Sequence, residues 1–195
     1  MTKNPVLGHC KTRLANTLGN EKALAIYIQL LDYTSSFAKD VNADLYVYST
    51  DEITDKQRWK SPQTYFRIQS KGDLGARMNS AIQDVLQEGY KKTIVIGSDC
   101  IEINSTDIHA AFQQLNSHDI TLGPALDGGY YLIGIKNVTP TLFQEITWST
   151  NSVLKETISK IKSEKLSYFL HAEKSDIDVE EDLKRDGYVE LNLHC

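Results

Sequence analysis

A short basic segment near the start of the chain has the composition of a phosphate-binding loop. It reads KNPVLGHCKTRL over residues 3–14 and joins a turn-forming glycine, Gly8, to two cations, Lys11 and Arg13. Glycine lets a ligand approach the backbone closely, and the N–H groups at the start of a helix bind anions. We therefore expect Gly8, Lys11 and Arg13 to bind phosphate groups, although an ordinary solvated basic loop has the same composition.

A glycine-containing segment between a predicted strand and a predicted helix is a second candidate for ligand binding. It reads GDLGARM over residues 72–78. Its two glycines, Gly72 and Gly75, allow a ligand to lie against the main chain. An ordinary strand-to-helix turn, in which Asp73 caps the following helix, explains the same pattern. Both interpretations stay open at the level of sequence.

Acidic residues at two places are candidate ligands for a divalent cation. Asp99 follows the apolar run TIVIG at residues 93–97, a pattern typical of strands buried on both faces in parallel sheets. Ligands bind beyond the carboxyl ends of such strands, and carboxylate oxygens suit Mg²⁺ or Mn²⁺. Asp176 and Asp178 alternate along an extended segment, so both can face one metal. We expect Asp99 and Asp178 to lie close together in space, although capping of a turn or helix also accounts for them.

The segment GPALDGGYY at residues 123–131 combines an acid with two adjacent glycines. Asp-Gly between two apolar runs is a strong hairpin signal. Gly128 and Gly129 can equally form the floor of a sugar or acceptor pocket. In that case Asp127 would bind acceptor hydroxyls or act as a general base. A hairpin turn and a functional role are compatible.

These segments lie between elements that alternate in type along the chain. Apolar spacing and cap residues predict helices at residues 21–38, 74–87, 105–115, 141–146, 153–162 and 179–185. The same reasoning predicts strands at residues 44–49, 65–69, 93–97, 120–122, 130–135 and 167–170. Alternating strands and helices indicate an α/β layered fold, with chemistry expected in the loops that follow the strands.

The bulk composition limits the class of protein. The 195 residues suit one domain, 1–195, and 41 % apolar residues suffice for a normal core. The net charge of −5 is spread without a basic stripe, which argues against a nucleic-acid partner. The cysteines at 10, 100 and 195 fit no zinc pattern. Neither a signal peptide nor a run of about 18 apolar residues is visible. We therefore expect a cytoplasmic protein with reduced thiols and no membrane span.

The order of the motifs resembles one family closely. The series is KNPVLGHCKTRL, GDLGARM, IGSDC, GPALDGGYYLIG, ITWST and DIDVEEDL, and it covers residues 3 to about 183. It is similar to the bacterial glycosyltransferase-like proteins labelled radical-SAM/selenodomain-associated transferase 1. These are relatives of the GT-A-fold nucleotide-diphospho-sugar transferases. They also resemble the guanylyltransferases of deazaflavin-cofactor synthesis and the molybdenum-cofactor nucleotidyltransferases.

The resemblance implies a single-domain, Rossmann-like mixed sheet flanked by helices, and it assigns the candidate residues to three sites. The phosphates, base and ribose of a nucleotide would be bound by Gly8, Lys11, Arg13, Gly72, Asp73, Gly75 and Arg77. A Mg²⁺ or Mn²⁺ ion would be bound by Asp99, Asp178 and Asp176. The sugar or acceptor would be faced by Asp127, Gly128 and Gly129, with Asp127 and Lys11 as catalytic residues.

The chain departs from the family pattern in two features. Ile101 stands where the family usually has a proline after the cysteine. The family also has a buried first strand before the basic segment, whereas only Met1 to Lys3 precede it here. A typical strand needs about 5–6 residues. We therefore expect the central first strand to be truncated and the native gene to begin upstream of Met1.

The leading functional prediction is metal-dependent glycosyl transfer from a nucleotide-diphosphate sugar to an unknown acceptor. Nucleotidyl transfer from a nucleoside triphosphate to a phosphorylated acceptor needs the same metal and the same basic loop, so it is the main alternative. A non-catalytic nucleotide-binding homologue is a further alternative.

Overall fold

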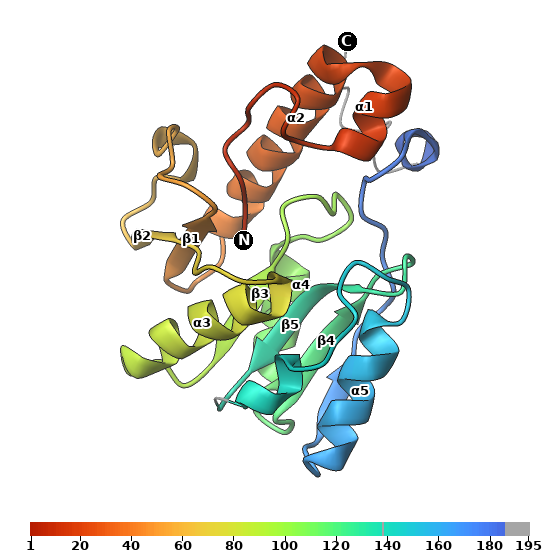
Figure 1. Cartoon of the computed structure of the whole chain (residues 1–195). Helices are drawn as coiled ribbons and strands as arrows, with labels where there is room; N and C mark the ends of the chain where they lie inside the picture. The colour runs from red at the N-terminus through yellow and green to blue at the C-terminus, as the bar shows by residue number, and fades with distance from the viewer. Residues whose placement is uncertain (138, 186–195) are drawn as a thin grey trace. The chain divides into compact units, whose positions relative to one another are not determined.

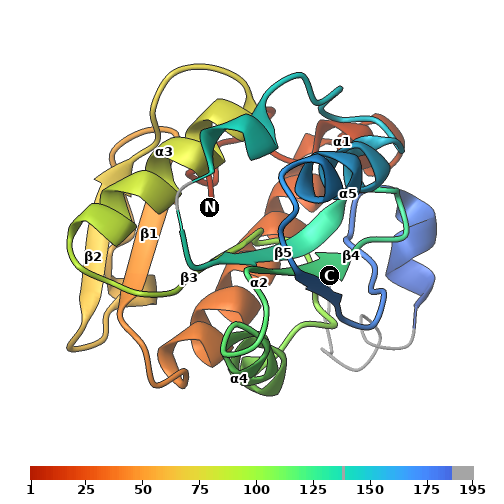
Figure 2. The same cartoon turned by 90° about the horizontal axis from the view of Figure 1, so that it is seen from below.

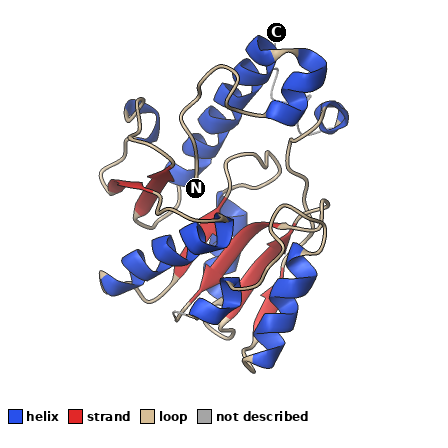
Figure 3. Cartoon of the chain, in the orientation of Figure 1, coloured by secondary structure: helices blue, strands red, loops and turns tan. Residues whose placement is uncertain are grey.

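The computed structural model describes residues 1–137 and 139–185 and is coloured along the chain in Figure 1. Helices and strands alternate through most of this length. Figure 3 shows both kinds of element, and the α/β class predicted from the sequence is confirmed. The chain divides into two compact units. The prediction of a reduced thiol at Cys195 lies outside the described residues.

The four-strand unit comprises Met1 and residues 69–97 and 106–174. Its sheet has the strand order β3 (Thr93–Ile96), β5 (Tyr130–Ile135), β4 (Ile120–Pro124) and β6 (Tyr168–Leu170). Strand β5 runs antiparallel to β3 and β4, whereas β4 and β6 are parallel. Figure 2 shows which helices cover the sheet. The helices α3 (Leu74–Gln87) and α5 (Val153–Ser163) lie on one face, and α4 (Ser105–Gln114) lies on the other.

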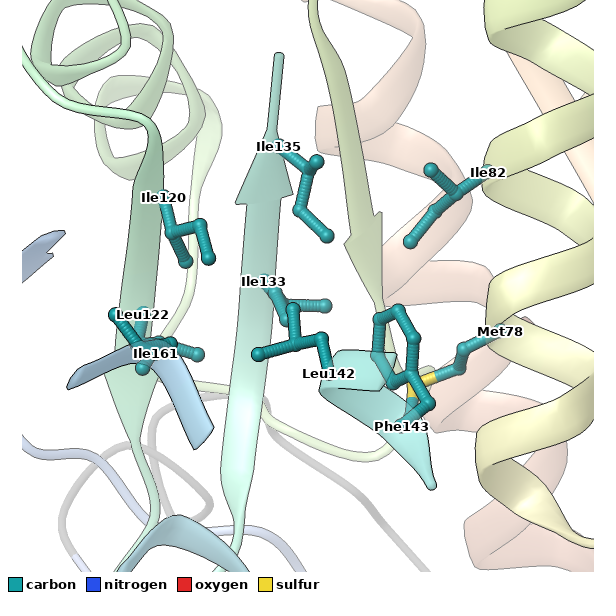
Figure 4. Packing of buried hydrophobic residues seen from close by; sticks show 9 residues of the cluster. All are labelled: Met78, Ile82, Ile120, Leu122, Ile133, Ile135, Leu142, Phe143 and Ile161. Atoms are coloured by element: carbon teal, nitrogen blue, oxygen red, sulfur yellow. The ribbon is translucent and has the colours of Figure 1, made fainter. Parts of the chain in front are cut away.

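The core of this unit fills the space between the sheet and the helices α3 and α5. It also includes the 3₁₀-helix Pro140–Phe143. Figure 4 shows its nine buried side chains, Met78, Ile82, Ile120, Leu122, Ile133, Ile135, Leu142, Phe143 and Ile161. Burying a side chain of this size stabilises a fold by roughly 1.5–3 kcal/mol. The packed core therefore holds the strands of this sheet in place, and with them the turns at the strand ends.

In the described part of the chain, the two-strand unit comprises residues 2–68, 98–105 and 175–185. Its helices are α1 (Thr12–Leu18) and α2 (Asn20–Lys39), with 3₁₀-helices at Gln57–Trp59 and Glu180–Lys184. The strands β1 (Leu45–Ser49) and β2 (Thr64–Ile68) form a parallel pair. Thr2 adds an isolated parallel bridge to Ser49, and the Thr2 backbone N–H donates to Tyr48 O at 2.8 Å. The expected upstream strand stays a prediction.

The apolar spacing of the two longest helices predicted their positions well. Helix α3 spans residues 74–87 as predicted, and α2 exceeds its predicted range by one residue at each end. The five residues that the spacing places on one face of α2, Ala23, Tyr27, Leu30, Leu31 and Thr34, are all buried. Asn20 is the first residue of α2, and Gly19 precedes it with φ of 84°. No helix within the described ranges is long and apolar enough to cross a membrane.

The interpretation of the apolar run at residues 93–97 is wrong in two respects. Strand β3 pairs antiparallel with β5, and it is an edge strand of the four-stranded sheet. Ile94, Val95 and Ile96 are half-buried, not buried. An apolar run reports that a strand contacts a core, but it carries no information about the direction of the neighbouring strand.

Two predicted helices are shorter than expected and have 3₁₀ geometry. The predicted helix at 141–146 is the 3₁₀-helix Pro140–Phe143, and Glu145 beyond it has a left-handed backbone with φ of 56°. The predicted helix at 179–185 is the 3₁₀-helix Glu180–Lys184. Short runs of 3₁₀-helix are common as connectors, and periodicity over so few residues does not distinguish them from an α-helix.

A histidine in the four-strand unit makes a pH-dependent contribution to stability. The ring of His171 lies 5.0 Å from that of Phe169, and its Nε2 is within 2.5 Å of the buried Thr121 Oγ1. Burial lowers the pKa of His171. The charge of Asp107 opposes this effect, and that of Lys174 adds to it. The folded protein therefore favours the neutral ring.

Because the folded pKa lies below the unfolded value of about 6.5, this contribution is present above that value and is lost as the pH falls through the folded pKa. We expect the temperature at the unfolding midpoint of the wild type to decrease as the pH is lowered from 7.5 to 5. The His171→Gln variant should lose less over the same range, as measured by thermal unfolding in a pH series. Parallel pH curves for the two proteins would contradict this assignment.

Candidate functional site

A buried ammonium group lies between two carboxylates in the two-strand unit. Lys11 Nζ is 2.9 Å from Asp99 Oδ2 and 2.8 Å from Asp178 Oδ1. The Lys11 side chain is only 6 % exposed, whereas those of Asp99 and Asp178 are 36 % and 41 % exposed. The two carboxylate oxygens are thus no farther apart than the sum of those distances, well below the roughly 10 Å beyond which two acids cannot share one ion. The predicted proximity of Asp99 and Asp178 is met.

Three segments that are distant in sequence meet here because their apolar neighbours share one core. Leu14, Ile101 and Ile177 belong to a single buried cluster. Leu14 follows Lys11 by three residues, Ile101 follows Asp99 by two, and Ile177 directly precedes Asp178. Packing of these side chains therefore brings the three charged residues together.

Backbone hydrogen bonds fix the two acidic segments. The Ile177 N–H donates to Asp99 O at 2.9 Å, which joins the segments directly. The Asp182 carboxylate accepts from the backbone N–H groups of Asp178 and Val179, both at 2.9 Å. Asp182 thus holds the turn that presents Asp178. Sequence reasoning missed its role, although its spacing of four residues from Asp178 at the start of a helical turn was a usable capping signal.

Lys11 has an unusual backbone conformation. Its φ of 46° and ψ of 49° lie in the left-handed region, which is uncommon for a residue other than glycine. Lys11 directly precedes α1, and its carbonyl oxygen accepts from Ala15 N at 2.9 Å. The conformation costs roughly 1–2 kcal/mol.

The charges of the cluster reinforce one another. Burial by itself lowers the pKa of Lys11, but the charges of Asp99 and Asp178 outweigh it and hold the pKa above its ordinary value. Burial likewise acts to raise the pKa of Asp178, but Lys11 and, more weakly, Arg13 hold it below its usual range. Lys11 therefore stays protonated and can act as a cation but not as a proton acceptor.

The other residues predicted for this region have different environments. Arg13 Nη1 lies 3.4 Å from Asp178 Oδ2, and the Arg13 side chain is 64 % exposed and thus open to a ligand. Gly8 is exposed with φ of 76°, so its turn needs a residue that tolerates a left-handed backbone. Asp176 is half-buried. Burial raises the pKa of the Cys100 thiol, and the negative charge of Asp176 raises it further. A metal-ligating role for Asp176 stays a prediction.

The remaining predicted residues belong to the four-strand unit. Asp73 caps α3, since its Oδ1 accepts from Ala76 N at 2.8 Å. Arg77 Nε donates to Gly72 O at 2.9 Å, which closes the turn before the helix. A Cβ atom on Gly75 would lie 2.5 Å from the indole ring of Trp148, so packing alone explains this glycine. A nucleotide-binding role for this segment stays a prediction.

Asp127, Gly128 and Gly129 form the turn between the antiparallel strands β4 and β5, so the hairpin predicted for Asp-Gly is present. Asp127 is exposed, and its Oδ1 accepts from Gly129 N at 2.8 Å. Gly128 has φ of 89°, and its carbonyl oxygen accepts from Leu154 N at the start of α5. A pocket-floor role for these glycines stays a prediction.

The ITWST motif, to which the sequence assigned no role, lies in a loop of the same unit. Trp148 packs against Gly75, and its ring centroid lies 6.5 Å from that of Tyr130. Glu156 holds the loop by accepting from Thr147 N at 2.7 Å and from the hydroxyl of Ser152 at 2.6 Å. This loop thus connects the GDLGARM and LDGGYY segments within the four-strand unit.

Residues 33–150 match the model of a family described as an uncharacterized protein conserved in bacteria, DUF2064. The chain belongs to the DUF2064 family. The DUF2064 match contains Asp99 and the segments around Gly75 and Asp127, whereas Lys11 and Asp178 lie outside it. A search of curated proteins finds no match.

Solved structures confirm the fold. The DUF2064 chain is similar to a protein of Desulfovibrio desulfuricans G20 that carries the provisional name nucleotide-diphospho-sugar transferase, with 27 % identity and a TM-score of 0.84 over 98 % of this chain and 92 % of that one. A CMP:2-keto-3-deoxy-manno-octonic acid synthetase complexed with CTP has 10 % identity and a TM-score of 0.58 over 98 % of both chains. The bifunctional IspDF of Campylobacter jejuni has 10 % identity and a TM-score of 0.52 over 82 % of this chain and 45 % of that one. The chain therefore has the fold of the nucleotide-diphospho-sugar transferases.

Proposed function

We propose that this protein is a transferase that uses a nucleotide-diphosphate sugar and a divalent cation, of the radical-SAM/selenodomain-associated transferase 1 type. The observation that carries the proposal is the convergence of Asp99 and Asp178 on Lys11. The similarity to the Desulfovibrio desulfuricans protein over nearly the whole chain supports it. We place the reaction in the cytoplasm, because Cys10 and Cys100 are free thiols, which stay reduced there.

The residues of the cluster fit Mg²⁺ or Mn²⁺ if the ion is shared with a substrate. The oxygens of Asp99 and Asp178 already converge on a cation, and more than a third of each side chain is exposed to solvent. In the described part of the chain, no group of three or more His, Cys, Asp or Glu residues is placed to hold a metal. Mg²⁺ is often held by one or two carboxylates together with water and substrate phosphates. This ligand set therefore favours an ion that binds with the nucleotide.

Each side chain has a defined task in this proposal. Lys11 and Arg13 bind the phosphate oxygens of the leaving nucleotide, and Asp99 and Asp178 hold the ion. A bound ion supplies positive charge where negative charge develops on the leaving diphosphate. Gly72, Asp73, Gly75 and Arg77 contact the base and ribose. Gly128 and Gly129 face the sugar or acceptor, and the exposed carboxylate of Asp127 removes the proton of the acceptor hydroxyl.

Nucleotidyl transfer is the second candidate, because the fold is shared with a CMP-sugar-acid synthetase solved with CTP. The same cluster would then hold the phosphates of a nucleoside triphosphate. Pyrophosphate would be the leaving group.

A ligand screen tests the proposed function. Thermal unfolding is measured with Mn²⁺ and a panel of nucleoside diphosphates, UDP- and GDP-sugars and nucleoside triphosphates. We expect a nucleotide sugar or its nucleoside diphosphate to raise the unfolding midpoint most. Stabilisation by triphosphates alone, with release of pyrophosphate, would favour nucleotidyl transfer. The absence of stabilisation by every nucleotide would refute both candidates.

A further inference from the structure

The ammonium of Lys11 lies where a divalent cation would have to bind. A cation that binds Asp99 Oδ2 and Asp178 Oδ1 at roughly 2.1 Å lies within about 5 Å of Lys11 Nζ as long as Nζ keeps its contacts. Like charges at that separation repel strongly in a partly buried site. The two cations therefore compete for the same pair of oxygens.

The net charge of the cluster also disfavours a divalent cation that binds without nucleotide. Lys11 and Arg13 carry two positive charges, and Asp99 and Asp178 carry two negative charges, so the four side chains are neutral together. A divalent cation that enters alone leaves this group with an excess of positive charge. A nucleotide diphosphate removes the excess, because its phosphate oxygens attract Lys11 and Arg13 and leave the carboxylates to the ion.

The surroundings of Lys11 allow this exchange. Residues 6–9, just before it, are exposed, so an anion can reach the basic loop from solvent. The lysine stem has several rotatable bonds, so the ammonium can move without a change in the strained backbone at φ of 46°.

We infer that Lys11 is an internal counter-cation that keeps divalent metal out of the Asp99–Asp178 pair until the phosphates of a nucleotide draw its ammonium away. This inference rests on the proposed function and extends it to the order of binding. Metal and nucleotide then bind cooperatively, and each raises the affinity of the other by the same factor. The pair of acids also stays neutralised in the absence of substrate.

The test is the affinity for Mn²⁺ alone, measured by titration followed by electron paramagnetic resonance. Lys11→Met removes the charge but keeps an apolar stem of similar length. We expect this variant to bind Mn²⁺ without nucleotide about tenfold more tightly than the wild type, or more, which is within the usual range of coupling between sites. Lys56→Met is the matched control, because it removes an exposed lysine paired with Glu52 in the same unit. It should leave Mn²⁺ affinity unchanged.

In the wild type, a nucleoside diphosphate should raise Mn²⁺ affinity about tenfold or more, and in Lys11→Met this enhancement should shrink. Folding of each variant is checked by circular dichroism, and Lys11→Gln replaces Lys11→Met if the latter does not fold. The inference is overturned if the neutral variant binds Mn²⁺ no more tightly than the wild type. It is also overturned if the wild type binds Mn²⁺ alone as tightly as with nucleotide. Failure of every nucleotide to bind would instead refute the proposed function, while the comparison with Mn²⁺ alone would still decide the role of Lys11.

Discussion

Replacing Asp99 by asparagine should remove most of the metal-dependent affinity for nucleotide while the fold persists. Asparagine keeps the shape of the side chain and the backbone carbonyl that accepts from Ile177 N, so the junction between the two acidic segments is preserved. It removes one of the two charges that would hold the ion. Loss of residues that only support metal ligands already costs about 10–100-fold, so we expect a loss of about 100-fold or more, measured by calorimetry with Mn²⁺ and nucleotide.

The same variant should keep or raise its affinity for nucleotide without metal, because Lys11 loses one of its two competing partners. Asp32→Asn is the control, since Asp32 is also an ion-paired acid of the two-strand unit, at 2.7 Å from Arg58 Nε, but lies outside the Lys11 cluster. If the Mn²⁺-dependent affinity for nucleotide is unchanged in Asp99→Asn, the assignment of Asp99 as a metal ligand is wrong.

Replacing Gly128 by alanine should strongly destabilise the four-strand unit. A Cβ atom on Gly128 would lie 2.2 Å from the backbone carbonyl oxygen of Asn151, and φ at this position is 89°. The left-handed backbone costs an alanine roughly 1–2 kcal/mol, and overpacking adds typically about 1–3 kcal/mol. We therefore expect the free energy of unfolding to fall by about 2–5 kcal/mol, measured by urea denaturation.

Gly89 offers a matched comparison in the same unit. Its φ is 100°, but a Cβ atom there would meet no heavy atom within 4 Å. Gly89→Ala should therefore cost only the backbone term, roughly 1–2 kcal/mol. If the two variants lost equal stability, the close approach of Asn151 to position 128 would add nothing to the cost of the substitution. The left-handed backbone at 128 would then account for the glycine by itself.

Elements were predictable where a pattern extends over several turns. The apolar face of α2 and the cap and length of α3 were both visible in the sequence, because helical periodicity over 14 to 20 residues is hard to imitate by chance. The direction of β3 was not predictable. Its neighbour β5 lies more than 30 residues along the chain, and nothing in TIVIG distinguishes a parallel from an antiparallel partner.

The candidate site was predictable in its chemistry and less so in its arrangement. The motif order selected Lys11, Asp99 and Asp178, and the two acids were expected to be close because one carboxylate seldom holds an ion alone. The ammonium between them was not expected, because no local pattern links Lys11 to acids 88 and 167 residues away. For Asp73 and Gly75 the sequence left both a local structural role and ligand binding open. The structure shows a helix cap at Asp73 and packing of Gly75 against the Trp148 ring, while ligand binding by this segment stays a prediction.

The sequence by itself determined the α/β class, the long helices and the types of residue able to bind phosphate and metal, since these follow from local propensity, periodicity and side-chain chemistry. The tertiary structure alone decided that Leu14, Ile101 and Ile177 share a core, and hence that one buried cation neutralises two distant acids. The physical reason is that burial of apolar surface is non-directional. It brings segments together by the shape of the whole unit, and the charged residues beside those segments acquire their partners only as a result.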